Sequence, residues 1–119
     1  MGLIIKTLGV KAYSFSTEEF RYDFLIDSGA LYSLVPGHDL KKLGVLPRST
    51  YDFFLADGTK VIRPVGEAYF QFDGMGATSP VIFGESGDQP ILGVTTLENC
   101  GLVLHPLKRE IYPMSVIRL

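Results

Sequence analysis

One acidic residue in this sequence stands where a carboxylate is energetically costly. An apolar run, residues 24–26, leads directly into Asp27, Ser28, Gly29 and Ala30. The run is typical of the end of a buried strand, and Asp-Ser-Gly favours a tight turn, because Asp and Ser bond to nearby backbone and glycine accepts positive φ. A carboxylate in this position costs free energy unless it is hydrogen-bonded or paired. The cost is the first indication that Asp27 has a chemical role, although an ordinary turn after a strand has the same pattern.

Other combinations of reactive side chains are weaker candidates. Ser33, His38, Asp39 and His105 could be arranged as a hydrolase triad, but no Gly-x-Ser-x-Gly motif accompanies them. The two histidines and the scattered carboxylates form no metal-ligand motif. The single cysteine, Cys100, offers neither an internal disulfide nor a thiolate cluster. We therefore expect no metal site and no cofactor.

Composition limits the classes of protein that could present such a turn. The 119 residues suit one domain, residues 1–119, with a substantial core. Frequent glycine, plentiful aromatic residues and few helix-forming windows predict an all-β domain with short turns. The 11 basic and 13 acidic residues are not clustered, which argues against a nucleic-acid or membrane-surface partner. The apolar run near the start is too short for a signal peptide, so we expect a cytoplasmic location.

The elements that would position the Asp27 turn can be read from the alternation of apolar and polar residues. The predicted strands are residues 3–10, 20–26, 31–35, 51–55, 60–62, 66–72, 81–83, 102–104 and 111–117. Asp57 and Gly58 lie between two of these runs and predict a hairpin. Short helices are predicted at residues 36–44, which end on Gly44, and at residues 95–101, with Thr95 as a candidate N-cap.

Three features, in this order, resemble the retropepsin-like aspartic proteases, the single-domain relatives of pepsin. They are the strand that ends in Asp27-Ser28-Gly29-Ala30, the hairpin at Asp57-Gly58, and the motif Ile91-Leu92-Gly93 before a short helix. The resemblance covers most of the chain, from about residue 20 to its end. It implies a small closed, β-barrel-like acid-protease fold with one or two short helices. It also implies a homodimer, with the active site on the two-fold axis.

The resemblance implies a reaction that needs two copies of the chain. Aspartic proteases hydrolyse peptide bonds with two carboxyl groups that share one proton. The ionised group takes a proton from a bound water, and the protonated group donates to the scissile carbonyl oxygen. This chain has one Asp-Ser-Gly motif, so a two-fold dimer would have to bring Asp27 against its own copy. The implied activity is that of an aspartic endopeptidase.

The residues around Asp27 acquire expected roles from the same resemblance. Ser28 would fasten the two active-site loops to each other, and Gly29 would allow the backbone to approach the carboxylates. The hairpin would be a flap that closes over an extended polypeptide substrate. The residues expected to contact substrate are Ala30, Leu31, Leu55, Ala56, Asp57, Gly58 and Ile91.

The sequence departs from the retroviral pattern at one point, and a second function stays open. Retroviral enzymes usually follow the apolar-apolar-Gly motif with Arg and then Asp or Asn, whereas Gly93 is followed here by Val94 and Thr95. A dimer of this chain must therefore be held in another way. The same fold could also serve as a dimeric peptide-binding or assembly module with little or no proteolysis, because a fold does not determine a function. A β-barrel that binds a small ligand has no supporting motif.

Overall fold

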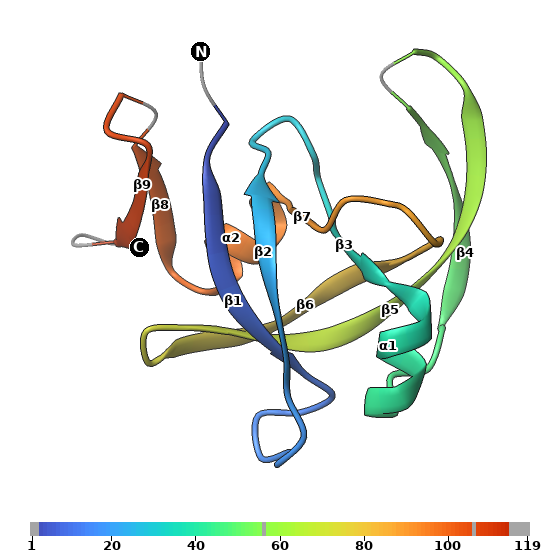
Figure 1. Ribbon diagram of the computed structural model, residues 1–119, viewed down its shortest axis with the longest axis horizontal. Helices are drawn as coiled ribbons and strands as arrows, with labels where there is room; N and C mark the ends of the chain where they lie inside the picture. The colour runs from blue at the N-terminus through green and yellow to red at the C-terminus, as the bar shows by residue number, and fades with distance from the viewer. Residues whose placement is uncertain (1–2, 56, 106, 115–119) are drawn as a thin grey trace, which may run out of the picture.

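The computed structural model describes residues 3–55, 57–105 and 107–114, and in this part the chain is mostly β (Figure 1). The strands are β1 (Ile5–Lys11), β2 (Phe20–Ile26), β3 (Ser33–Pro36), β4 (Ser49–Phe54), β5 (Lys60–Phe72), β6 (Met75–Gly84), β7 (Ile91–Leu92), β8 (Leu102–His105) and β9 (Glu110–Pro113). The helices are α1 (Gly37–Leu43) and α2 (Val94–Asn99). The predicted mostly β fold with two short helices is confirmed. No helix among these residues is long and apolar enough to cross a membrane.

The main sheet closes on itself as a ring. Its strand order is β1-β2-β7-β3-β6-β5-β4, and β1 also pairs with β5. Only β4 lies outside this circuit, as an extension of β5. Two of the pairings, β2 with β7 and β3 with β6, are parallel. Because parallel neighbours end at the same edge, the residues that follow β2 and β7 are brought together.

The core fills the space inside the ring, and the alternation of apolar residues explains which side chains reach it. Leu8, Val10, Phe24 and Phe70 are completely buried. The rings of Phe24 and Phe70 lie with their centroids 6.0 Å apart, in the range of favourable aromatic pairs. These side chains come from β1, β2 and β5, so the core packs the first two strands of the chain against β5, its longest strand.

The hairpins follow the predicted turn chemistry. Asp57 and Gly58 lie in the turn between β4 and β5, and Gly58 has a φ of 87°. Asp73 and Gly74 join β5 to β6 with φ values of 46° and 80°, as a two-residue turn of positive φ requires. The sequence predicted two short strands around Pro64, but β5 is continuous, because it pairs with β4 before Val65 and with β6 after it.

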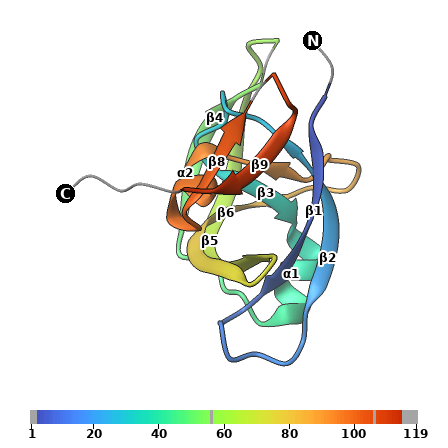
Figure 2. The same ribbon diagram turned by 90° about the vertical axis from the view of Figure 1, so that its left-hand side faces the viewer.

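The two helices are short, and each covers part of the ring. Leu40 and Leu43 are the buried face of α1, and Gly44 ends it with a φ of 92°, as predicted. Helix α2 begins at Val94, and its N-cap position is Gly93, two residues before the predicted Thr95. The strands β8 and β9 form a separate two-stranded sheet, which Figures 1 and 2 show near the N-terminal end of β1. Most of the predicted last strand beyond β9 lies outside the described residues.

Candidate active site

The backbone of Asp27 is fixed by the parallel pairing of β2 with β7. In the register, Ile26 lies beside Leu92. The ladder continues past the end of β2, because the Asp27 amide donates to the Leu92 carbonyl oxygen at 3.0 Å. The backbone of Asp27, the first residue of the loop after β2, is therefore held in place by β7. Figure 1 shows this loop at the upper end of the ring, close to β7.

The Asp27 carboxylate is held by its own turn. The Gly29 amide donates to Asp27 Oδ1 at 2.9 Å, and the Ala30 amide donates to the Asp27 carbonyl oxygen at 3.1 Å. A Cβ atom on Gly29 would lie 3.2 Å from the same carboxylate oxygen, so a side chain here would crowd the carboxylate. The half-buried Asp27 thus has the hydrogen bond that its position demands.

The turn between β7 and α2 packs against the Asp27 loop and donates hydrogen bonds to it. The Val94 amide donates to the Ala30 carbonyl oxygen at 2.8 Å, and the Thr95 amide donates to the Leu31 carbonyl oxygen at 3.1 Å. At Gly93, a Cβ atom would lie 2.6 Å from the carbonyl carbon of Tyr32. Only glycine allows so close an approach of two backbones. The motif Ile91-Leu92-Gly93 therefore lies against the Asp27 loop.

Three buried hydroxyl groups tie this support to the rest of the ring. Thr96 Oγ1 is 2.5 Å from Ser33 Oγ and 2.8 Å from Ser79 Oγ, and the Gly93 amide donates to Ser33 Oγ at 2.9 Å. All three hydroxyl residues are completely buried. The network joins α2, β3 and β6. This network was not predicted from the sequence, where its one signal is a serine inside the apolar run 31–35.

A cavity of about 560 Å³ opens beside the Asp27 carboxylate. Of the residues predicted to form the site, it brings together Asp27, Gly29, Ala30, Leu31, Leu55 and Ile91. Ser28 is exposed and lies in the loop without lining the cavity, and the same holds for Asp57 and Gly58 in the hairpin turn. Ala56 lies outside the described residues.

Several side chains of the cavity wall were missed by the sequence analysis. They are Tyr32, Leu34, Phe53, Phe54, Val61, Arg63, Ile82, Asp88 and Gln89. Part of this set could have been predicted from the alternation of side chains along a strand, because Val61 and Arg63 share one face of β5. Phe53 is the register partner of Val61 on β4. The loop that contributes Asp88 and Gln89 carries no such pattern.

The hairpin carboxylate of Asp57 has a structural task in the turn. The Thr59 amide donates to Asp57 Oδ1 at 2.9 Å. Hydrogen bonds from Thr59, through its side chain and its amide, hold the pKa of Asp57 below the ordinary value. The Asp57 carboxylate is exposed and does not line the cavity, so it stabilises the turn.

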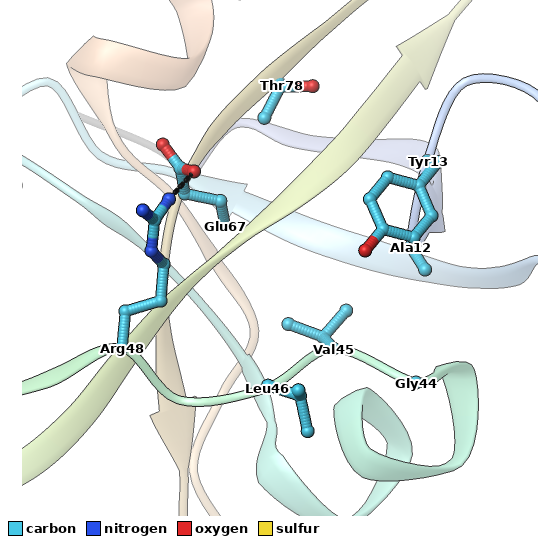
Figure 3. Close-up of a pocket in the computed structure, with 8 residues that line it drawn as sticks. All are labelled: Ala12, Tyr13, Gly44, Val45, Leu46, Arg48, Glu67 and Thr78. Carbon is cyan, nitrogen blue, oxygen red and sulfur yellow. Dashed lines mark hydrogen bonds and ion pairs between the residues drawn. The ribbon is translucent and has the colours of Figure 1, made fainter.

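A second, smaller cavity of about 300 Å³ lies elsewhere on the molecule (Figure 3). It is lined by Ala12, Tyr13, Gly44, Val45, Leu46, Arg48, Glu67 and Thr78. Figure 3 shows Arg48 directed toward Glu67, with which it forms an ion pair. The lining contains no residue of the Asp27 loop. This cavity therefore does not extend the candidate active site.

Across residues 3–55, 57–105 and 107–114, no group of three or more His, Cys, Asp or Glu side chains is placed to hold a metal ion. In comparisons with known proteins, the chain matches no protein-family model and no curated protein sequence.

Proposed function

We propose that the chain is an aspartic endopeptidase that acts as a homodimer, with Asp27 of each protomer as the catalytic residue. The observation that carries the proposal is the position of the Asp27 carboxylate. It follows β2 at the parallel junction with β7, accepts the Gly29 amide, and borders a cavity of about 560 Å³ with a largely apolar wall. A proton-exchanging group beside an apolar cleft is the arrangement that peptide hydrolysis requires.

The reaction needs a second carboxyl group at the same place, and a second copy of the chain supplies it. Two carboxyl groups in contact cannot both ionise, so they share one proton. One takes a proton from water while the other donates a hydrogen bond to the scissile carbonyl oxygen. Ser28 and Gly29 are exposed in the Asp27 loop, which leaves room for a symmetric loop to approach. Ser28 then bonds across the interface.

A polypeptide substrate binds in extended form between the Asp27 loop and the β4–β5 hairpin. Alternate side chains of such a peptide enter pockets on one face. Leu31, Phe54 and Leu55 are 61%, 73% and 48% exposed, although all three line the cavity. Exposed apolar side chains around a cleft favour a partner that covers them. Closure of the hairpin over the peptide excludes water from the reacting groups.

A dimeric peptide-binding module is the second candidate, and one observation favours it. The cavity exists within a single chain, so a peptide can bind without the close approach of two carboxylates that catalysis needs. The two candidates therefore differ in one geometric requirement, the distance between the two Asp27 side chains in the dimer.

The test compares the natural chain with Asp27→Asn. Purified protein is incubated with a mixture of quenched fluorescent peptides, and cleavage sites are read by mass spectrometry while sedimentation measures the oligomer. We expect the natural chain to cleave and Asp27→Asn to be inactive yet still dimeric. Asp73→Asn is the matched control, because this carboxylate lies in a turn outside the cavity and asparagine accepts its positive φ.

The outcomes separate the candidates. Cleavage that persists in Asp27→Asn contradicts the catalytic role of Asp27. Peptide binding by a natural chain that does not cleave favours the binding module.

A further inference from the structure

The wall of the cavity is largely apolar, and away from Asp27 it holds a single cation. Among the described residues that line it, Arg63 is the only basic side chain. Arg63 lies on β5, two positions beyond Val61, so both side chains face the cavity from the same side of the strand. A peptide that runs along this strand meets an apolar subsite and then a positively charged one.

The guanidinium of Arg63 is sheltered, but its ionic partner is not. The Arg63 side chain is 16% exposed, whereas the side chain of Glu85, with Oε1 3.3 Å from Arg63 Nη2, is 70% exposed. Arg63 Nη1 donates to the Ile62 carbonyl oxygen at 3.2 Å. A guanidinium carries five N–H donors, so these two contacts leave donors for another acceptor. A solvent-exposed ion-pair partner contributes little stability and is readily exchanged for a carboxylate from a ligand.

One further acid lies beside Glu85. Asp88 also lines the wall, but its Oδ2 accepts the Glu85 amide at 2.8 Å. The Asp88 carboxylate is thus engaged in its own loop. Arg63 and Glu85 are the pair that a bound carboxylate rearranges.

The charged subsite is separated from the Asp27 carboxylate by a row of apolar side chains. On one side of the ring, strands β6, β3 and β7 lie between β5 and β2; on the other side only β1 does. One residue from each of these three strands lines the cavity, and the registers align them as Ile82, Leu34 and Ile91. A side chain bound at Arg63 therefore lies across this apolar row from the Asp27 loop.

From these observations, we propose that Arg63 is a specificity-determining residue that selects polypeptides with an Asp or Glu side chain at one subsite of the cleft. The proposal rests on the proposed function in taking the ligand to be an extended peptide. The carboxylate replaces Glu85 and receives two parallel hydrogen bonds from the guanidinium, a geometry that arginine favours. Because Arg63 lies on β5 and not in the Asp27 loop, the subsite acts on binding more than on the chemical step.

The experiment measures peptide binding apart from cleavage. Asp27→Asn protein is titrated with fluorescein-labelled, otherwise uncharged peptides that differ only in Glu, Gln or Lys at each position in turn, and Kd is read by fluorescence anisotropy. At one position, we expect Glu to bind about tenfold more tightly than Gln, the net gain when charge-assisted bonds to the ligand replace the exposed pair with Glu85. Adding Arg63→Gln should abolish this preference. Arg48→Gln is the matched control, since Arg48 is paired with Glu67 at the second cavity.

A second variant keeps the test independent of any effect of Arg63 on folding. Glu85→Gln removes the competing carboxylate from an exposed position, so the affinity for the Glu peptide should rise. Three results overturn the proposal: equal affinity or no binding for all peptides, a Glu preference that survives Arg63→Gln, or a loss of Glu-peptide affinity in Glu85→Gln.

Failure of the proposed function is recognised separately, by a natural chain that cleaves none of the peptides or by cleavage that persists in Asp27→Asn. In an active natural chain, Arg63→Gln should raise KM for the Glu peptide more than it lowers kcat.

Discussion

The Asp27 amide donates a 3.0 Å hydrogen bond to the carbonyl oxygen of Leu92, a residue from a distant part of the chain. This bond extends the parallel pairing of β2 with β7 by one step. It places the carboxylate-bearing turn directly over Gly93, where two backbones are nearly in contact. The position of the candidate catalytic group is therefore set by backbone pairing and by the small size of one glycine.

Substitution of Gly93 tests this arrangement. In Gly93→Ala, the new methyl group must displace the Tyr32 backbone, from which it would otherwise lie 2.6 Å. Overpacking of this kind typically costs about 1–3 kcal/mol of unfolding free energy. We expect a loss in this range by urea denaturation, together with a loss of peptidase activity. Gly29→Ala offers a comparison, because its Cβ atom meets only the Asp27 carboxylate at 3.2 Å. It should impair activity with a smaller loss of stability, and an unchanged melting curve for Gly93→Ala would contradict the packing argument.

The buried hydroxyl groups of Ser33, Ser79 and Thr96 predict a loss of stability when one of them is removed. In Thr96→Val, the side chain keeps its shape but leaves Ser33 and Ser79 without the hydroxyl that they share. Because an unsatisfied buried polar group costs about 1–3 kcal/mol, the unfolding free energy should fall by that amount. The matched control is Thr78→Val, since Thr78 is exposed. Equal stability of the two variants would show that the network contributes nothing beyond packing.

The fold and the site differed in how far they could be predicted from the sequence. The hairpin at Asp57-Gly58 and the C-terminal glycine of α1 were predicted correctly, because each depends on local backbone preference. The loop around Asp27 was also recognised, since an apolar run before Asp-Ser-Gly is a local pattern. These features need no knowledge of what lies across the sheet.

What escaped prediction depends on contacts between distant segments. The hydroxyl group of Thr96 meets Ser33 and Ser79 only after α2 has packed against β3 and β6. Arg63 was not predicted to line the cavity, because the continuous strand β5 appeared in the sequence as two runs divided by Pro64. Proline in a strand is usually a sign of an interruption. Here β5 changes its pairing partner from β4 to β6 next to this residue, and this change can be seen only once the strand pairing is known.

If two protomers share one active site, an inactive chain should inhibit the active chain with which it forms a mixed dimer. If each site contains one Asp27 from each protomer, a mixed dimer with Asp27→Asn has one carboxyl group and cannot divide the acid and base roles. Mixing the natural chain with an excess of Asp27→Asn should therefore reduce activity per natural chain toward zero as subunits exchange. The same excess of Asp73→Asn should not reduce it. Activity that is indifferent to added Asp27→Asn would rule out a site built from two protomers.

The same model predicts a dependence on protein concentration. Monomers lack half of the site, so the specific activity should rise with concentration until the dimer is saturated. Sedimentation at the same concentrations gives the dimer fraction, which should follow the activity. A specific activity that stays constant while the dimer fraction changes would assign catalysis to the monomer.

The contact between Tyr22 and Asp39 makes stability depend on alkaline pH. Tyr22 Oη donates to Asp39 Oδ2 at 2.5 Å and so links β2 to α1. Burial, and then the hydrogen bond and charge of Asp39, raise the pKa of Tyr22 well above its ordinary value near 10. Above about pH 10 the unfolded chain loses this proton while the folded chain keeps it, so the unfolded state binds fewer protons. The contribution of Tyr22 to stability is thus full below pH 10 and declines as the pH rises further.

Urea denaturation of Tyr22→Phe at a series of pH values measures this contribution. At neutral pH the variant should be less stable by about 1.5–3 kcal/mol, the usual value of a hydrogen bond to a charged group. The difference between the natural chain and the variant should shrink above about pH 10, because only the natural chain carries the titrating hydroxyl. Tyr13→Phe, a change at an exposed ring, corrects for general alkaline effects. A difference that stays constant from neutral to strongly alkaline pH would mean that the Tyr22 proton is not retained by the fold.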